Sequence, residues 1–176
     1  AEHHTVGKRN LSPMRNQSCF RSLVRREESA MSIEKMISEH PDVRGNYNDS
    51  LGLAVKHAMY CAAICNSCAD ACSAEEMDMR RCIRLCLDCA DVCTATYRTA
   101  TRRTDENRQL IRSILAVCIE ACEICAEECE RHDHDHCRRC AEMCRECARD
   151  CRTALAELNA EVHAEGERST FAHNAA

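Results

Sequence analysis

The sequence predicts an all-α protein, an antiparallel up-down-up-down four-helix bundle with a short extra N-terminal helix. Three observations lead to this fold class. The 176 residues include only four glycines and two prolines, and 3% are aromatic, which suits helices and disfavours sheets. All cysteines but Cys19 recur at steps of three and four residues, the spacing of one helix face. This pattern occurs in four separate segments, so we expect four helices that share one sulfur-lined axis.

Cysteine supplies the interior stripe of each expected helix. At roughly 100° per residue, steps of four, three and four keep successive sulfurs within an arc of about 60°. The stripes are Cys61, Cys65, Cys68 and Cys72; Cys82, Cys86, Cys89 and Cys93; Cys118, Cys122, Cys125 and Cys129; and Cys137, Cys140, Cys144, Cys147 and Cys151. Leu, Ile and Val are sparse between Cys61 and Cys93, so cysteine must fill the core.

The chain divides into four parts by composition and periodicity. We expect a flexible tail over residues 1–30, a short N-terminal helix within 31–45, the cysteine-lined bundle over 46–160, and a flexible tail over 161–176. The first tail is rich in arginine and has no periodic apolar face. The bundle alone therefore carries the expected fold.

The N-terminal helix and the first bundle helix have readable ends. Apolar residues at helical spacing predict a short helix over Met31–His40, and Pro41 ends it. The first bundle helix is expected over about 51–72. Asp49 or Ser50 can accept a backbone hydrogen bond as its N-cap.

The second and third bundle helices follow short joints. Residues 73–76 read Ser-Ala-Glu-Glu, the form of a capping box, so the second helix should start close after the first and run to about Ala100. Asp105 and Glu106 form an acidic start for the third helix, which should end near Glu130.

The fourth bundle helix should begin after a histidine-rich link. Asp133 or Asp135 can cap it, and its pattern fades near Asn159. Because short links join antiparallel neighbours, the four cysteine stripes should converge on one axis.

Charge and hydropathy exclude several kinds of partner. Twenty-four Lys and Arg residues against 29 Asp and Glu residues make the chain mildly acidic, which favours neither nucleic acid nor an anionic membrane. No apolar run is long enough for a signal-peptide core in the first thirty residues or for a bilayer span. We therefore expect a cytoplasmic protein in a reducing environment.

So many cysteines in register indicate metal binding rather than packing or a disulfide scaffold. Small apolar residues would fill a core without the risk of oxidation, and disulfide scaffolds are usually short and secreted. Structural zinc sites generally use loop CxxC pairs, and iron–sulfur ligands usually lie on loops. Cu(I) is soft, prefers thiolates and accepts few ligands, so it is the expected cofactor, with multiple ions per chain.

Two alternatives remain open, a thiol redox protein and a zinc-sequestering bundle. No polarised substrate pocket or open coordination position can be identified in the sequence, so we do not expect an enzyme. A redox protein would need a distinguished thiol pair of low pKa, whereas the stripe positions look equivalent.

The two ends of the expected tube differ in their side chains. Toward the short links, the stripes lead to soft or basic candidate copper ligands, which are Met77, Met79, His132, His134 and His136. We expect copper to enter and leave there. Toward the other end the stripes lead mainly to aliphatic residues, with His57, one turn before Cys61, as a further candidate ligand.

The cysteine segments resemble one known family. Cys61-AAI-Cys65-NS-Cys68-ADA-Cys72 and its three counterparts are similar to the bacterial copper storage proteins, and the lack of an export signal suggests the cytosolic branch. The resemblance covers about residues 46–160. It implies a four-helix bundle that stores many Cu(I) ions on cysteine thiolates and assembles as a homotetramer. A copper chaperone or a small-thiol carrier would then be its partner.

Overall fold

The computed structural model describes residues 32–41, 43, 47–102 and 107–174, with side chains described as far as residue 164. Its helices, in chain order, are α2 (Ile33–Ser38), α3 (Asp49–Ser73), α4 (Arg80–Ala100), α5 (Arg108–Cys129) and α6 (Asp135–Asn174). These residues form no strand. The expected tail over 1–30 lies outside the described residues.

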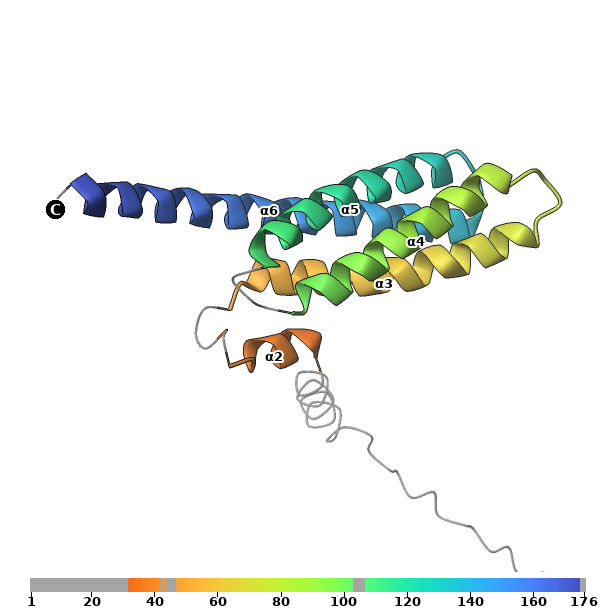
Figure 1. Ribbon diagram of the computed structural model, residues 1–176. Coiled ribbons are helices and arrows are strands. Elements are labelled where there is room, and N and C mark those ends of the chain that lie inside the picture. The colour runs from red at the N-terminus through yellow and green to blue at the C-terminus, as the bar shows by residue number, and fades with distance from the viewer. Residues whose placement is uncertain (1–31, 42, 44–46, 103–106, 175–176) are drawn as a thin grey trace, which may run out of the picture. The chain divides into compact units, whose positions relative to one another are not determined.

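Helices α3 to α6 form the expected four-helix bundle (Figure 1). In the ring they make, α3 packs against α4 and α6, and α5 packs against α4 and α6. The short helix α2 packs against α3. The all-α prediction and its short N-terminal helix are therefore confirmed.

The observed helix ends correct three sequence predictions. Helix α3 is capped by Asn48, whose side-chain oxygen accepts from the Leu51 backbone N–H at 2.7 Å, in place of Asp49 or Ser50. The expected capping box at 73–76 does not form, because the Ser73 hydroxyl donates to the Asp70 carbonyl at 2.6 Å and closes α3 instead. Helix α4 therefore begins at Arg80, after a longer turn than the sequence predicts.

The ends of the last two bundle helices also differ from expectation. Helix α5 begins at Arg108, and the expected acidic start at Asp105 and Glu106 lies outside the described residues. Helix α6 continues to Asn174 rather than ending near Asn159 before a flexible tail. Its last turns contain no proline, and the single glycine there, Gly166, lies within the helix without ending it.

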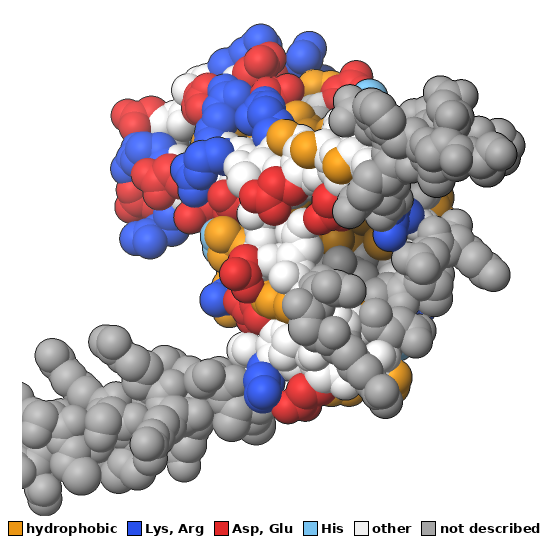
Figure 2. Space-filling model, turned by 90° about the vertical axis from the view of Figure 1, so that its left-hand side faces the viewer, with side chains coloured by type: hydrophobic (Ala, Val, Ile, Leu, Met, Phe, Trp, Pro, Cys, Tyr) orange, Lys and Arg blue, Asp and Glu red, His pale blue; other side chains and the backbone are white. Residues whose placement is uncertain are grey.

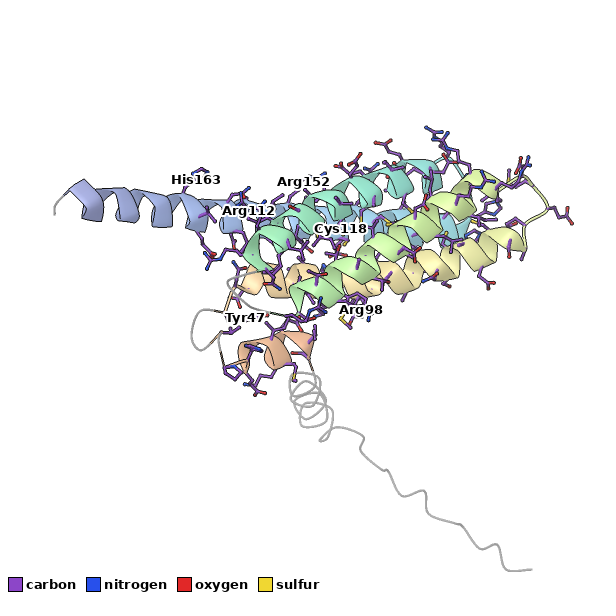
Figure 3. All side chains as sticks on the ribbon, viewed as in Figure 1. Tyr47, Arg98, Arg112, Cys118, Arg152 and His163 are labelled. Atoms are coloured by element: carbon purple, nitrogen blue, oxygen red, sulfur yellow. The ribbon has the colours of Figure 1, made fainter. Side chains whose placement is uncertain are left out.

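The cysteine stripes form the core of the bundle. All cysteines in them are at most 2% exposed, and Figure 3 shows Cys118 inside the bundle while Arg98 and Arg152 lie outside it. Aliphatic residues fill the end away from the 74–79 turn, where Leu51, Val55 and Leu115 are fully buried. This end is called the leucine end below.

The described surface carries both signs of charge. On the face drawn in Figure 2, basic and acidic side chains lie side by side with scattered hydrophobic ones. None of the described helices combines the length and the hydropathy that a membrane crossing requires.

Candidate metal centre

The buried sulfurs form one continuous set of contacts along the bundle. A path of Sγ–Sγ separations of 3.5–4.0 Å leads from the 74–79 turn to the leucine end, and each cysteine on it contacts the next. In order, the path passes through Cys72, Cys82, Cys129, Cys86, Cys125, Cys65, Cys144, Cys61, Cys122, Cys93, Cys118 and Cys151. Each step of this path crosses from one helix to another. All 17 cysteines of the stripes are free thiols.

These separations fit shared metal coordination. Two thiolates on one ion with a metal–sulfur bond of about 2.3 Å lie about 3.8 Å apart in a tetrahedron and about 4.0 Å apart in a trigonal plane. Several groups of four ligand atoms lie within 4.8 Å of one another, among them Cys65, Cys125, Cys140 and Cys144. The sulfurs thus need little movement to share ions.

His136 joins the sulfur set at the end where the 74–79 and 130–134 turns lie, called the histidine end below. Its Nδ1 lies 3.5 Å from Cys68 Sγ and 3.4 Å from Cys137 Sγ, and its Nε2 is 3.1 Å from a Glu75 carboxylate oxygen. A carboxylate on one ring nitrogen directs the other toward a metal site. The ring is thus oriented with one nitrogen toward the thiols.

The second histidine of this end lies farther out. His134 stacks on His136 with ring centroids 5.2 Å apart. Its Nδ1 lies 3.2 Å from the same Glu75 oxygen, and its Nε2 lies 3.2 Å from Met77 Sδ. Glu75 therefore holds both rings, a role that the sequence pattern did not reveal because acidic residues interleave with every stripe.

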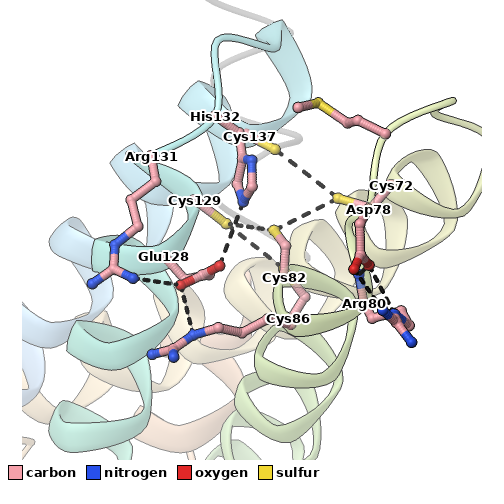
Figure 4. A network of polar contacts seen from close by, with 12 residues as sticks. Cys72, Asp78, Arg80, Cys82, Cys86, Glu128, Cys129, Arg131, His132 and Cys137 are labelled. Carbon is pink, nitrogen blue, oxygen red and sulfur yellow. Dashed lines mark hydrogen bonds and ion pairs between the residues drawn. The ribbon is translucent and has the colours of Figure 1, made fainter.

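A buried carboxylate lies beside the sulfurs at the same end (Figure 4). Glu128 is 5% exposed and accepts from Arg81 Nε at 2.8 Å and from Arg131 at 3.2 Å. His132 Nε2 lies 3.5 Å from the other Glu128 oxygen. His132 therefore faces this ion-pair cluster. The sequence pattern does not distinguish Glu128 from the other acidic residues between the cysteines, and its burial is evident only in the structure.

The remaining two candidates occupy different environments. Met79 is 3% exposed and precedes the first residue of α4, three positions before Cys82. His57 lies one turn before Cys61, and its Nδ1 contacts a carboxylate oxygen of Asp150 on α6. Asp150 also lies 3.5 Å from Arg149 Nε. His57 thus has only Nε2 left for any further ligand.

Burial shifts the pKa of two thiols at the histidine end. It raises the pKa of Cys72 above its ordinary value, and it raises the pKa of Cys137 to about 12, in both cases helped by neighbouring thiols. Burial alone would lower the pKa of His136, but contacts with Cys68 and Glu75 raise it. A metal cation that binds Cys72 or Cys137 must therefore displace a proton from sulfur.

Comparisons with known proteins agree on one family. The family model described as copper storage protein matches residues 47–156. The chain is 38% identical to Ccsp from Streptomyces lividans loaded with 10 copper equivalents, with a TM-score of 0.67 over 70% of this chain and 98% of that one. No curated protein sequence matches the chain.

Two further solved structures are similar. A cytosolic copper storage protein from Streptomyces lividans with five coppers is 41% identical, with a TM-score of 0.60 over 61% of this chain and 93% of that one. The Cu(I)-bound copper storage protein BsCsp3 is 34% identical, with a TM-score of 0.53 over 58% and 94%.

Proposed function

The chain belongs to the copper storage protein family, and on that premise we propose that it stores many Cu(I) ions on the cysteine thiolates inside its bundle. The observation that carries the proposal is the sulfur path: buried thiols from four helices, with neighbouring sulfurs 3.5–4.0 Å apart. Since a thiolate can bridge two ions, the capacity is on the order of one Cu(I) per stripe cysteine.

Copper enters and leaves at the histidine end. Met77 and His134 offer a thioether and an imidazole at the partly exposed rim, and His136 lies next to three thiols. Glu75 keeps the Nδ1 atom of His136 directed toward those sulfurs. An ion would therefore pass from rim ligands to thiolates without crossing the leucine end.

The other candidate ligands have secondary roles. Met79, buried near Cys82, supplies a soft thioether inside the same end. His132 faces Glu128, so its first role is to hold the 130–134 turn against α4 through the ion-pair cluster. His57 can meet copper only through Nε2.

Storage takes place in the cytosol, and the protein acts as a binder rather than as a catalyst. The similarity to a cytosolic copper storage protein supports this location. Thiol redox cycling is disfavoured because exchange needs an accessible thiolate, and every cysteine in the stripes is buried. A copper chaperone or a small-thiol carrier would deliver the ion.

We also propose that the chain forms a homo-oligomer, which by family resemblance is a tetramer. Leu110, Val117 and Ile124 recur every seven residues on α5 and are 42–55% exposed, and Leu87 on α4 is 44% exposed. An apolar stripe of this kind is typical of a helix that packs against another subunit. Light scattering after size-exclusion chromatography should give four times the 19.9 kDa chain mass.

Copper titration tests the storage function directly. Reduced protein is titrated with Cu(I) without oxygen against a chromogenic chelator, and a second sample is titrated with zinc. We expect the protein to take up many Cu(I) equivalents, on the order of one per stripe cysteine, before the coloured Cu(I)–chelator complex forms. Saturation at one or two equivalents, or preferential filling by zinc, would contradict storage.

A further inference from the structure

We propose that the histidine end carries a second metal site, made of nitrogen and oxygen donors, which binds a divalent ion and thereby closes the copper route. Its ligands are Glu75, His134 and His136. This inference rests on the proposed entry of copper at the histidine end and adds an inhibitor to it. The observation that carries it is the orientation of the two rings, each of which turns one nitrogen toward the same Glu75 oxygen and the other nitrogen toward sulfur.

Ligand atoms of three residues converge at this rim. The Oε1 atom of Glu75 lies 3.2 Å from Nδ1 of His134 and 3.1 Å from Nε2 of His136. The two imidazole rings are stacked, with centroids 5.2 Å apart and 16° between their planes. One small ion can therefore contact all three residues after slight rotations of the side chains.

The separations match those between two ligands of one divalent ion. With metal–nitrogen and metal–oxygen bonds of about 2.1 Å, two ligands lie about 3.0 Å apart at a right angle and about 3.4 Å apart in a tetrahedron. The two nitrogen–oxygen distances at the rim fall between these limits. They are also hydrogen-bond distances, so ring hydrogens take the place of the ion until one binds.

Donor type separates this site from the thiol core. Imidazole and carboxylate together suit divalent ions such as Zn(II) and Co(II), whereas thiolates and thioethers suit Cu(I). Two histidines and one glutamate, with a position open to water, are a recurring ligand set for zinc. The three side chains are 24–31% exposed, so water can complete the coordination. The rim can therefore hold a divalent ion outside the sulfur core.

The same two rings supply the nitrogens that the copper route needs. Nε2 of His134 lies 3.2 Å from Met77 Sδ. Nδ1 of His136 lies 3.5 Å from Cys68 Sγ. A neutral imidazole has one lone pair for a metal, on the nitrogen that carries no hydrogen. An ion on the Glu75 side takes this lone pair on both rings and leaves the hydrogens on the sulfur side. A divalent ion and Cu(I) therefore exclude each other at the histidine end.

Cobalt binding tests the site by its spectrum. Reduced protein is titrated with Co(II) without oxygen, because Co(II) shows a sulfur-to-cobalt charge-transfer band only when a thiolate is among its ligands. We expect the first equivalent to bind without this band. Glu75→Gln should weaken that binding by at least about tenfold, since the loss of a supporting partner alone costs a metal site about this much. The matched control is Glu76→Gln at the exposed next residue, which should leave cobalt binding unchanged.

Copper loading in the presence of cobalt tests the closure. At a free Co(II) concentration of about ten times its dissociation constant, about one chain in eleven keeps a free entrance. The initial rate of Cu(I) uptake from a chelator complex should therefore fall about tenfold. In the Glu75→Gln variant cobalt should slow uptake by about twofold or less, relative to the same variant without cobalt. Removal of the cobalt should restore the rate in the wild-type protein.

The outcomes separate the divalent site from the storage function. A thiolate band with the first equivalent of cobalt, or an unchanged rate of copper uptake with cobalt bound, would overturn the proposal. Equal slowing of the wild-type protein and the Glu75→Gln variant would do so too. If the protein takes up no Cu(I) even without cobalt, the storage function and the copper route fall together, and the cobalt spectrum still decides whether the divalent site exists.

Discussion

Removal of one layer of thiols should remove a matching share of the copper capacity. Cys65, Cys125, Cys140 and Cys144 form a group with ligand atoms within 4.8 Å of one another. Their replacement by alanine deletes four of the 17 stripe thiols, so copper uptake should fall by about a quarter if each thiolate serves about one ion. Copper per chain is measured by elemental analysis after anaerobic loading and desalting.

The same substitutions should lower the free energy of unfolding by an amount that can be estimated from the burial of each sulfur. Each removes one fully buried sulfur, a change comparable to Ile→Val, so about 1 kcal/mol each and about 4 kcal/mol together. Native proteins have about 5–15 kcal/mol in total. The doubles Cys65→Ala/Cys144→Ala and Cys125→Ala/Cys140→Ala, at about 2 kcal/mol each, therefore test the same claim with less risk of unfolding.

The matched control is Cys19→Ala, which removes the one cysteine outside the stripes. It should leave copper capacity unchanged. Circular dichroism checks that every variant remains helical. An unchanged capacity in a folded quadruple variant would refute the reasoning, because copper would then be held elsewhere than on the thiol layers.

Three further outcomes follow from the core. Loading should raise the thermal midpoint, because copper binds the folded bundle far better than the unfolded chain, and equal midpoints for the empty and loaded protein in thermal melts would contradict this. Leu115→Ala should lower the free energy of unfolding of the empty protein by about 3 kcal/mol in a denaturant titration, because Leu115 is fully buried. Copper uptake should stay intact. A loss of uptake in the folded variant would show that the leucine end takes part in binding. Folding raises the pKa of Cys137 from 9.0 to about 12, so the stability that this thiol contributes is present below pH 9 and is lost as the pH rises toward 12. Thermal melts of the empty protein should therefore show a midpoint that falls between pH 9 and pH 12. A midpoint that rises there would contradict the burial of a protonated Cys137.

The fold could be predicted from the sequence because its core uses one residue type at one period. Cysteine at steps of three and four marks the buried face of each helix without ambiguity, and the few glycines and prolines leave the helices uninterrupted. The inward orientation of all four stripes follows from that periodicity. The family resemblance follows from the same positions.

Helix ends were harder to predict because several side chains compete for each cap. Asn48, Asp49 and Ser50 can each serve as an N-cap by accepting from a backbone N–H two or three residues on, and only the observed backbone path selects Asn48. Ser73 could cap the next helix or close its own, and the structure shows that it closes α3. Local sequence does not distinguish these outcomes.

Residues that support the site were missed for a different reason. Glu75, Glu128 and Asp150 resemble the many other acidic residues that interleave with the stripes. What distinguishes them is contact across helices and turns, with His136, Arg81 and His57 respectively. Such pairs depend on the relative rotation of two helices, which spacing within one helix cannot specify.

The location of the stored ions tests the central claim most directly. Anomalous difference maps at the copper absorption edge, from crystals of anaerobically loaded protein, would place every copper atom. We predict many peaks along the bundle axis, each bonded to cysteine sulfurs of at least one helix, with the first of them beside His136. Peaks confined to surface histidines and carboxylates, with the thiol core empty, would contradict the account.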